Sequence, residues 1–292
     1  MANLGPVGVY LPISFTRTPP ADSQRDAARR LERAGYRAVW TNEVVGGKDA
    51  LVQLAVLLAA TERLTFGTGI ANIWSREPQT LHAAAAFLAD AHPDRLVLGV
   101  GVGYPEQAAG TGRDFGRPLA TMRDYVARMD AETWPPAPAA AYPRILGANG
   151  PKMLALAAEI ADGALPANLP PAFTAEARAA VGPDKLLVVG LAVVPDAEIA
   201  RARAAAVERV TQTLNLPTFS NALRRLDFAL DDVEGIADAV VAHGGPDAIA
   251  AKVREHLAAG ADHVLLMPPS ADDFGADIAV LERLAPAFAD LG

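Results

Sequence analysis

Six consecutive residues combine the features of a phosphate-binding turn. Two glycines and an asparagine tolerate positive φ and expose successive backbone N–H groups. A proline then suits the first position of a helix, whose amino end adds partial positive charge, and a lysine follows it. These residues are Gly147, Ala148, Asn149, Gly150, Pro151 and Lys152. The segment predicts a phosphate cradle, although an ordinary loop–helix junction has the same spacing.

A second stretch is suited to contact with a flat ligand. Residues 64–70 have the apolar composition of a buried strand, and the residues that end it are small or carry an amide. Such residues let a backbone come close to a planar group. They are Gly69, Ile70, Ala71 and Asn72.

Two side chains are candidates for proton transfer. Glu43 follows an apolar strand and can serve as an acid, a base or a hydrogen-bond acceptor, although a loop carboxylate can also simply be solvated. Tyr104 can donate a proton or stack on a substrate, and it can equally be a structural aromatic. We therefore treat Glu43 and Tyr104 as candidate catalytic residues.

The glycines before Tyr104 match part of a dinucleotide-binding fingerprint. They are spaced Gly99-x-Gly101-x-Gly103, but Tyr104 stands where the last glycine of that fingerprint is required. A Rossmann site is therefore disfavoured. Small residues at a strand end also let a ligand or a neighbouring loop approach, which makes Gly101 a candidate ligand contact.

Several other chemistries lack their residues. The chain has no cysteine, which excludes disulfides, thiolate catalysis and cysteine-based metal sites. The four lysines lie outside the predicted strands, which argues against a Schiff-base aldolase. The five histidines show no ligand spacing with one another or with carboxylates, so no metal site is expected. They are His82, His92, His243, His256 and His263.

The candidate residues follow strands that alternate with helices. The predicted strands are residues 7–11, 38–41, 64–70, 95–101, 144–147, 163–166, 186–194 and 261–267. Eight such strands favour an α/β fold of the (β/α)₈ TIM-barrel type over an open doubly wound sheet. Functional groups of such barrels lie at the carboxyl ends of the strands, where these candidates fall.

One region is longer than the strand–helix alternation requires. Residues of about 196–244 follow the seventh strand and look largely helical. So long an excursion is more often a helical insertion or a subunit contact than a linker. A single domain spanning 1–292 with this insertion is the economical interpretation.

Composition narrows the class of partners. The 292 residues are 51% hydrophobic and carry a formal net charge of −8, with no run of basic residues. Nucleic acid and anionic membranes are therefore not expected as partners, whereas a small-molecule substrate is. Neither an export signal nor an apolar run long enough to span a bilayer is apparent, so we expect a cytoplasmic protein.

Taken together, the motifs resemble the luciferase-like monooxygenase superfamily, in particular its coenzyme F420-dependent oxidoreductases. The resemblance covers nearly the whole chain and is specific through the order and spacing of its parts. They are residues 35–43 (GYRAVWTNE), 61–70 (TERLTFGTGI), 94–101 (DRLVLGVG), 147–152 with 161–163, and 245–247 with 259–264.

The resemblance implies a flavin-type cofactor across the strand ends. Members carry a non-proline cis peptide at the end of strand three, which falls here at Gly69–Ile70, and the strand-five loop takes the cofactor phosphate. A homodimer is also implied. The expected cofactor-binding residues are Glu43, Gly69, Ile70, Ala71, Asn72, Gly101, Gly147, Ala148, Asn149, Gly150, Pro151 and Lys152.

The chain also departs from the family pattern. Many deazaflavin-dependent dehydrogenases carry an Asp-His pair where this chain has Glu43-Val44, and a glutamate after strand four is matched by Tyr104. A histidine-assisted oxidation of an alcohol or a sugar phosphate is therefore not supported. Hydride transfer itself requires only a positioned cofactor and substrate.

Three functional hypotheses follow. The first is an oxidoreductase that transfers a hydride between coenzyme F420 and a small organic substrate. The second is an FMN-dependent monooxygenase that uses oxygen and reduced flavin from a partner reductase. The third is a non-catalytic flavin-binding barrel.

Overall fold

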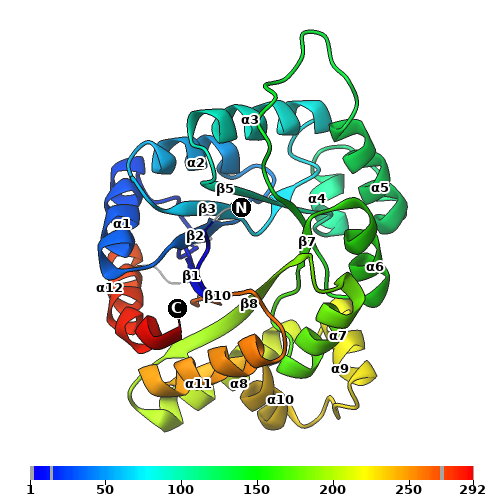
Figure 1. Cartoon of the computed structure of the whole chain (residues 1–292). Helices are drawn as coiled ribbons and strands as arrows, with labels where there is room; N and C mark the ends of the chain where they lie inside the picture. The colour runs from blue at the N-terminus through cyan, green and yellow to red at the C-terminus, as the bar shows by residue number, and fades with distance from the viewer. Residues whose placement is uncertain (1–2, 14–15, 270–272, 292) are drawn as a thin grey trace.

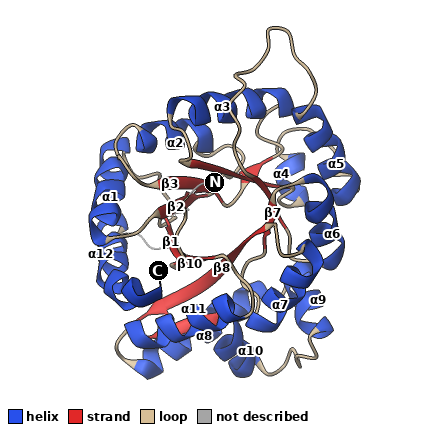
Figure 2. Cartoon of the chain, viewed as in Figure 1, coloured by secondary structure: helices blue, strands red, loops and turns tan. Residues whose placement is uncertain are grey.

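Eight parallel strands form an inner ring and the helices form an outer ring around it (Figure 1, Figure 2). The computed structural model describes residues 3–13, 16–269 and 273–291. The strands pair in the order β1-β2-β3-β5-β6-β7-β8-β10, and β10 closes the ring by pairing with β1. The predicted TIM-barrel fold is therefore confirmed. The strands are β1 (Val7–Tyr10), β2 (Ala38–Thr41), β3 (Thr65–Thr68), β4 (Ala71–Asn72), β5 (Leu96–Gly101), β6 (Arg144–Gly147), β7 (Gly163–Leu165), β8 (Leu186–Pro195), β9 (Val241–Gly244) and β10 (His263–Met267).

The outer helices follow the strands in chain order. None of them within the described ranges is both long and apolar enough to cross a membrane. They are α1 (Ala21–Ala34), α2 (Ala50–Leu58), α3 (Pro78–Ala91), α4 (Pro105–Ala109), α5 (Pro118–Met129), α6 (Pro151–Ile160), α7 (Pro171–Val181), α8 (Ile199–Thr213), α9 (Pro217–Arg225), α10 (Val233–Val240), α11 (Pro246–Ala258), α12 (Phe274–Leu284) and the 3₁₀ helix η1 (Ala285–Leu291).

Side chains fill the interior of the barrel. Trp40 of β2 is fully buried there, and its indole N–H donates to Nε2 of His263 at 3.0 Å. Gly67 on the neighbouring strand makes room for this ring, because a Cβ at Gly67 would lie 2.2 Å from it. The indole of Trp40 is thus one of the buried side chains that fill the barrel interior.

The segment after β8 contains a strand that the sequence did not indicate. Helices α8, α9 and α10 agree with the helical character expected there, but Val241–Gly244 forms β9. β8 pairs with β10 through Val188–Ala192, and its last residues, Ala192–Pro195, pair in parallel with β9. Because β8 continues beyond β10, its end has a free edge that β9 covers.

Three helices have details that the order of elements does not predict. Helix α1 begins at Ala21, and its N-cap residue, Pro20, makes no side-chain capping hydrogen bond. Helix α4 was not predicted, since its five residues are too short to show a period. At the end of the described chain, α12 begins at Phe274 and gives way to the 3₁₀ helix η1 at Ala285.

Candidate functional site

The third strand ends in a bend at the mouth of the barrel. β3 stops at Thr68, the Gly69–Ile70 peptide is cis, and β4 resumes alongside Val100 and Gly101 of β5. The cis bond expected at this position is confirmed. The strand predicted over 64–70 ends at Thr68, before the bend. β3 pairs with both β2 and β5, and the pairing with β5 continues in β4 beyond the bend. We refer to Gly69–Asn72 as the bulge.

Neighbouring strands hold the bulge by its peptide groups. The hydroxyl of Tyr10 donates to the carbonyl of Gly69 at 2.6 Å, and the Gly69 N–H donates to the carbonyl of Thr41 at 2.7 Å. The N–H of Glu43 donates to the carbonyl of Ile70 at 3.1 Å. Burial raises the pKa of Tyr10 above its usual range, so its hydroxyl remains a donor. The bulge is thereby fixed from β1 and β2.

Glycines on two strands make room for the side chain of Ile70. A Cβ at Gly101 would lie 2.6 Å from Cγ1 of Ile70, and one at Gly147 would lie 3.2 Å from Cγ2. Ile70 therefore lies over the ends of β5 and β6 and forms a floor across this part of the mouth. The predicted approach of a neighbouring loop to Gly101 is confirmed, and that loop is the bulge.

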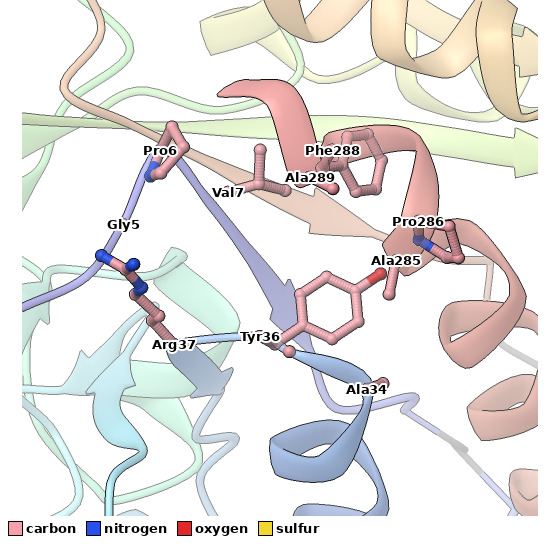
Figure 3. A pocket seen from close by; sticks show the side chains of 11 residues that line it. Gly5, Pro6, Val7, Ala34, Tyr36, Arg37, Ala285, Pro286, Phe288 and Ala289 are labelled. Atoms are coloured by element: carbon pink, nitrogen blue, oxygen red, sulfur yellow. The ribbon is translucent and has the colours of Figure 1, made fainter. Parts of the chain in front are cut away.

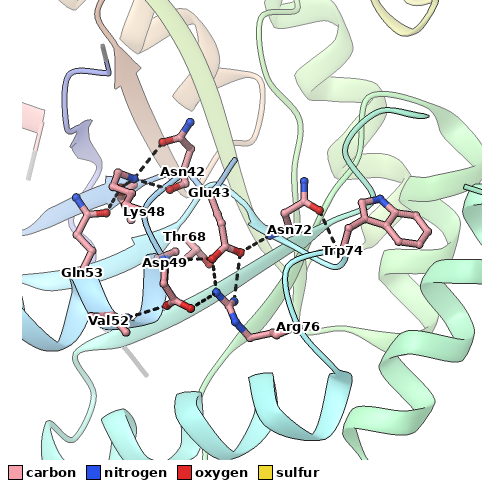
Figure 4. A network of polar contacts seen from close by, with 12 residues as sticks. Asn42, Glu43, Lys48, Asp49, Val52, Gln53, Thr68, Asn72, Trp74 and Arg76 are labelled. Carbon is pink, nitrogen blue, oxygen red and sulfur yellow. Dashed lines mark hydrogen bonds and ion pairs between the residues drawn. The ribbon is translucent and has the colours of Figure 1, made fainter. Parts of the chain in front are cut away.

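The carboxylate of Glu43 is the centre of a buried polar network beside the bulge (Figure 4). Its oxygens accept the N–H of Ala50 at 3.0 Å and the N–H of Asn72 at 2.9 Å. Arg76 forms an ion pair with both oxygens and also contacts Asp49 at 2.6 Å. Although burial opposes it, contact with Glu43 raises the pKa of Arg76, so the guanidinium stays charged. One carboxylate thus joins β2, α2 and the bulge.

Asn72 connects this network to Tyr104. Its Oδ1 accepts the N–H of Trp74 at 3.0 Å, and its Nδ2 donates to Oε1 of Gln107 at 3.0 Å. The same oxygen of Gln107 accepts the backbone N–H of Tyr104 at 2.9 Å. The side chain of Asn72 is fully buried, whereas Tyr104 is 46% exposed. Tyr104 therefore stands at the rim with a fixed backbone, and the Asn72 amide is used within the protein.

The loop after β6 has the predicted helix start but not the predicted backbone twist. Gly150 is the N-cap of α6, and Pro151 occupies its first turn. Gly150 is extended, with φ −151° and ψ 153°, and neither Gly147 nor Asn149 adopts a positive φ. Asn149 instead bridges to Ala167, accepting its N–H at 2.9 Å and donating to its carbonyl at 3.2 Å. The loop is an extended approach to a helix amino end, braced against the chain after β7.

The remaining residues of this loop differ in accessibility. Ala148 is buried and donates its N–H to the carbonyl of Leu165 at 3.1 Å. Pro151 and Lys152 are exposed, and a Cβ at Gly150 would meet nothing within 4 Å. Next to this loop, Oδ1 of Asn168 is buried without a hydrogen-bond partner in the described part of the chain. Open space, an unpaired acceptor and a helix amino end therefore occur together here.

The histidines and the opposite end of the barrel show no such convergence. Among the described residues, no group of three or more metal-ligating side chains comes together.

A cavity of about 230 Å³ lies before β1 and β2, at the amino end of the barrel, between Arg37, Tyr36 and Phe288 (Figure 3). Barrels of this type place their chemistry at the other end, so we assign no role to this cavity.

Three residues of the mouth escaped the sequence reasoning. Tyr10 ends a strand, and its position alone marks it as a candidate in a barrel. Arg76 precedes a helix and gives no local signal, because its partners Glu43 and Asp49 lie more than 25 residues away in the chain. Lys48 looked like a loop lysine, yet its ammonium folds back onto the end of β2.

Comparison with known proteins identifies the family. Residues 6–263 match the family model for luciferase-like monooxygenases. The chain belongs to this family. A Mycobacterium tuberculosis relative, whose name places it among the coenzyme F420-dependent oxidoreductases, is 30% identical over 188 residues, which are 53% of this chain and 54% of the relative. The 5,10-methylenetetrahydromethanopterin reductase of Methanolobus tindarius is 27% identical over 52% of both chains. The chain spans about half the length of these curated relatives.

Solved structures of other proteins share the fold over nearly the whole chain. An F420-dependent secondary alcohol dehydrogenase, in complex with an F420–acetone adduct, has a TM-score of 0.74 at 17% identity and covers 98% of this chain and 99% of its own. The EDTA monooxygenase of Chelativorans sp. BNC1 has a TM-score of 0.76 at 15% identity, with 99% and 94% covered. This luciferase-like barrel therefore resembles both oxidoreductases and monooxygenases.

Proposed function

We propose that this luciferase-like protein is an oxidoreductase that transfers a hydride between coenzyme F420 and a small organic substrate. The observation that carries the proposal is the floor that Ile70 forms over Gly101 and Gly147 at the carboxyl ends of the strands. A partly exposed apolar side chain on a backbone that neighbouring strands hold in place suits one face of a planar ring. The family and the F420-dependent relative support the same assignment.

The residues at the mouth fit a cofactor of this kind. The ring would lie on Ile70, and the phosphate would lie near Gly150, Pro151 and Lys152, where there is open space at the amino end of α6. The unpaired Oδ1 of Asn168 can accept a hydrogen bond from a ligand beside this loop. When bound, coenzyme F420 supplies or accepts the hydride, and the protein supplies orientation and electrostatics.

The two candidate catalytic residues occupy different positions in this scheme. The Glu43 carboxylate accepts hydrogen bonds from Ala50, Asn72 and Arg76 of the protein itself. These contacts support a role in positioning the bulge. Tyr104 is exposed at the rim and is free to turn its hydroxyl toward a substrate. The assignment of either residue as a proton donor stays a prediction.

Cofactor titration tests the proposal. Purified protein is titrated with F420 and, separately, with FMN, and the quenching of cofactor fluorescence gives the two dissociation constants. We expect tighter binding of F420. Turnover of the reduced cofactor is then measured with a panel of enones, imines, alcohols and aldehydes. Tighter binding of FMN would refute the cofactor assignment.

Two alternatives lead to other outcomes of the same experiment. The likeness to the EDTA monooxygenase, and to an FMN complex of 3,6-diketocamphane monooxygenase at a TM-score of 0.72, favours an FMN-dependent monooxygenase as the second candidate. That enzyme would consume oxygen when a reductase supplies reduced flavin. A protein that binds either cofactor but turns over no member of the panel would be a non-catalytic flavin-binding barrel.

We also propose that the protein is a homodimer, as its family resemblance implies. Light scattering at micromolar concentration measures the mass directly. A mass near 30.4 kDa would mean a monomer and would reject the proposal.

A further inference from the structure

A second cavity lies at the mouth of the barrel, on the side away from the Gly147–Lys152 loop. It has a volume of about 300 Å³ and lies between the loops that follow β1 and β2. Ile13 and Arg17 line it from the first loop, and Asn42, Val44 and Lys48 line it from the second. The cofactor residues proposed above belong to the bulge, β5 and β6, so this cavity lies where a substrate can reach the same mouth.

Lys48 provides a cation at this cavity, and its hydrogen-bond partners among the described residues are all neutral. Its Nζ donates to the backbone carbonyl of Asn42 at 2.7 Å, to Oγ1 of Thr41 at 2.9 Å and to Oδ1 of Asn42 at 3.3 Å (Figure 4). In the described part of the chain, no carboxylate forms an ion pair with it. The two nearest in sequence, Glu43 and Asp49, are both engaged by Arg76.

The charges around Lys48 favour a negative ligand. Buried charges in proteins are normally paired, and a charge that meets only dipoles is stabilised less well. Lys48 brings a positive charge to the cavity lining, and no described residue of the lining is a carboxylate, although the chain as a whole has a net charge of −8. Burial accordingly lowers the pKa of Lys48 to about 8, and the charge of Glu43 only partly opposes this.

We propose that this cavity binds a carboxylate group of the substrate, with the ammonium of Lys48 as its anchor. The ligand takes the place of the longest contact, that to Oδ1 of Asn42, and the Asn42 amide becomes available as a second donor. The two shorter contacts keep the ammonium in place. The inference rests on the proposed function in one respect only, namely that the ligand is the substrate rather than part of the cofactor.

An isosteric pair of probes tests the proposal. Benzoate and benzamide have nearly the same shape and differ in charge, and their dissociation constants for the full chain are measured at pH 7 by calorimetry or ligand-observed NMR. We expect benzoate to bind at least tenfold more tightly. In Lys48→Met, which keeps the apolar stem and removes the charge, this preference should disappear.

Lys185→Met is the matched control. Lys185 is also a partly buried amine held by a neutral group, since it donates to the carbonyl of Ala161, but it lies before β8 at the other end of the barrel. Its replacement should leave the preference for benzoate intact. Equal binding of the two probes to the unmodified protein, no binding of either, or a preference that survives in Lys48→Met would overturn the proposal.

Cofactor affinity separates this proposal from the proposed function. Lys48→Met should bind F420 within twofold of the unmodified protein, whatever that affinity is. A loss of F420 binding in this variant would show that the cavity holds a carboxylate of the cofactor tail, and would overturn the assignment to substrate. Failure of F420 to bind the unmodified protein would reject the proposed function and leave the benzoate result to be judged by itself.

The pH dependence of binding provides a test without any substitution, and it decides the matter if Lys48→Met does not fold. Besides Lys48, the charged groups of the described residues at this site are Glu43, Asp49, Arg76 and Arg17, and carboxylates and guanidiniums ordinarily titrate far from pH 7–9. Since a carboxylate binds the protonated amine, benzoate affinity should fall about tenfold between pH 7 and pH 9. Benzamide affinity should not change. A flat benzoate profile would contradict the role of Lys48.

Discussion

Replacing Arg76 with methionine is expected to destabilise the protein by roughly 3–5 kcal/mol, the usual cost of removing one partner of a buried ion pair. The side chains of Glu43 and Arg76 are only 2% and 9% exposed, so the carboxylate left behind cannot regain water. Asp49, the second partner of Arg76, is 43% exposed and can be solvated when the guanidinium is removed. Most of the loss therefore arises at Glu43.

Urea unfolding measures this loss. The transition is followed by both tryptophan fluorescence and circular dichroism, because coincident curves justify a two-state free energy. The matched control is Arg123→Met, which removes an equally direct ion pair with Glu159 where both side chains are at least half exposed. We expect no measurable shift for the control, since surface ion pairs contribute little.

A double variant identifies the source of the loss. Glu43→Gln removes the charge that Arg76→Met leaves unpaired, so the double variant should be more stable than Arg76→Met alone. The glutamine has one carbonyl oxygen where the glutamate has two, so it can accept the backbone N–H of Ala50 or of Asn72 but does not replace both contacts. The free energy of unfolding should therefore not return fully to that of the unmodified protein. If Arg76→Met lies within 1 kcal/mol of the unmodified protein, or if Glu43→Gln lowers its stability further, the reasoning is wrong.

Two further predictions concern the bulge and the barrel core. Gly101→Val should weaken cofactor binding at least tenfold without unfolding the barrel, because its side chain displaces Ile70. Gly245→Ala at the start of α11 is the control, because its Cβ enters open space away from the proposed cofactor residues, and it should bind the cofactor normally; equal affinities of the two variants in a fluorescence titration would contradict this. Burial lowers the pKa of His263 to about 4, so the unfolded chain takes up a proton first as the pH falls. Lowering the pH from 6.5 to 4 should therefore reduce the free energy of unfolding of the unmodified protein by about 3 kcal/mol, and that of His263→Gln should not show this loss. Parallel curves of unfolding free energy against pH for the two proteins would refute the prediction.

The fold could be predicted because its signals are local. Apolar runs such as 95–101, separated by helical segments, recur eight times, and parallel strands joined by helices can close into a barrel. The features that were missed are short or depend on distant pairing. β9 has four residues and forms because β8 extends past β10, while α4 has five residues.

The candidate site was only partly accessible to sequence reasoning. Its position at the strand ends and the bend at Gly69–Ile70 followed from element order and family resemblance, and the structure has both. The hydrogen-bond partners and the burial of its polar side chains could not be predicted from the sequence. Asn149 looked like a ligand contact but bridges to Ala167, and Glu43 looked like a loop carboxylate but is buried.

The sequence by itself therefore determined the barrel, the edge at which ligands are expected to bind and the glycines that admit the bulge, because these depend on residue type and spacing along one chain. Only the tertiary structure decided which charges are paired. Arg76 neutralises Glu43 from 33 residues away, and the partners of Lys48 within residues 3–13, 16–269 and 273–291 are neutral groups. Electrostatic pairing depends on distances across the mouth of the barrel, and no spacing within the sequence encodes those distances.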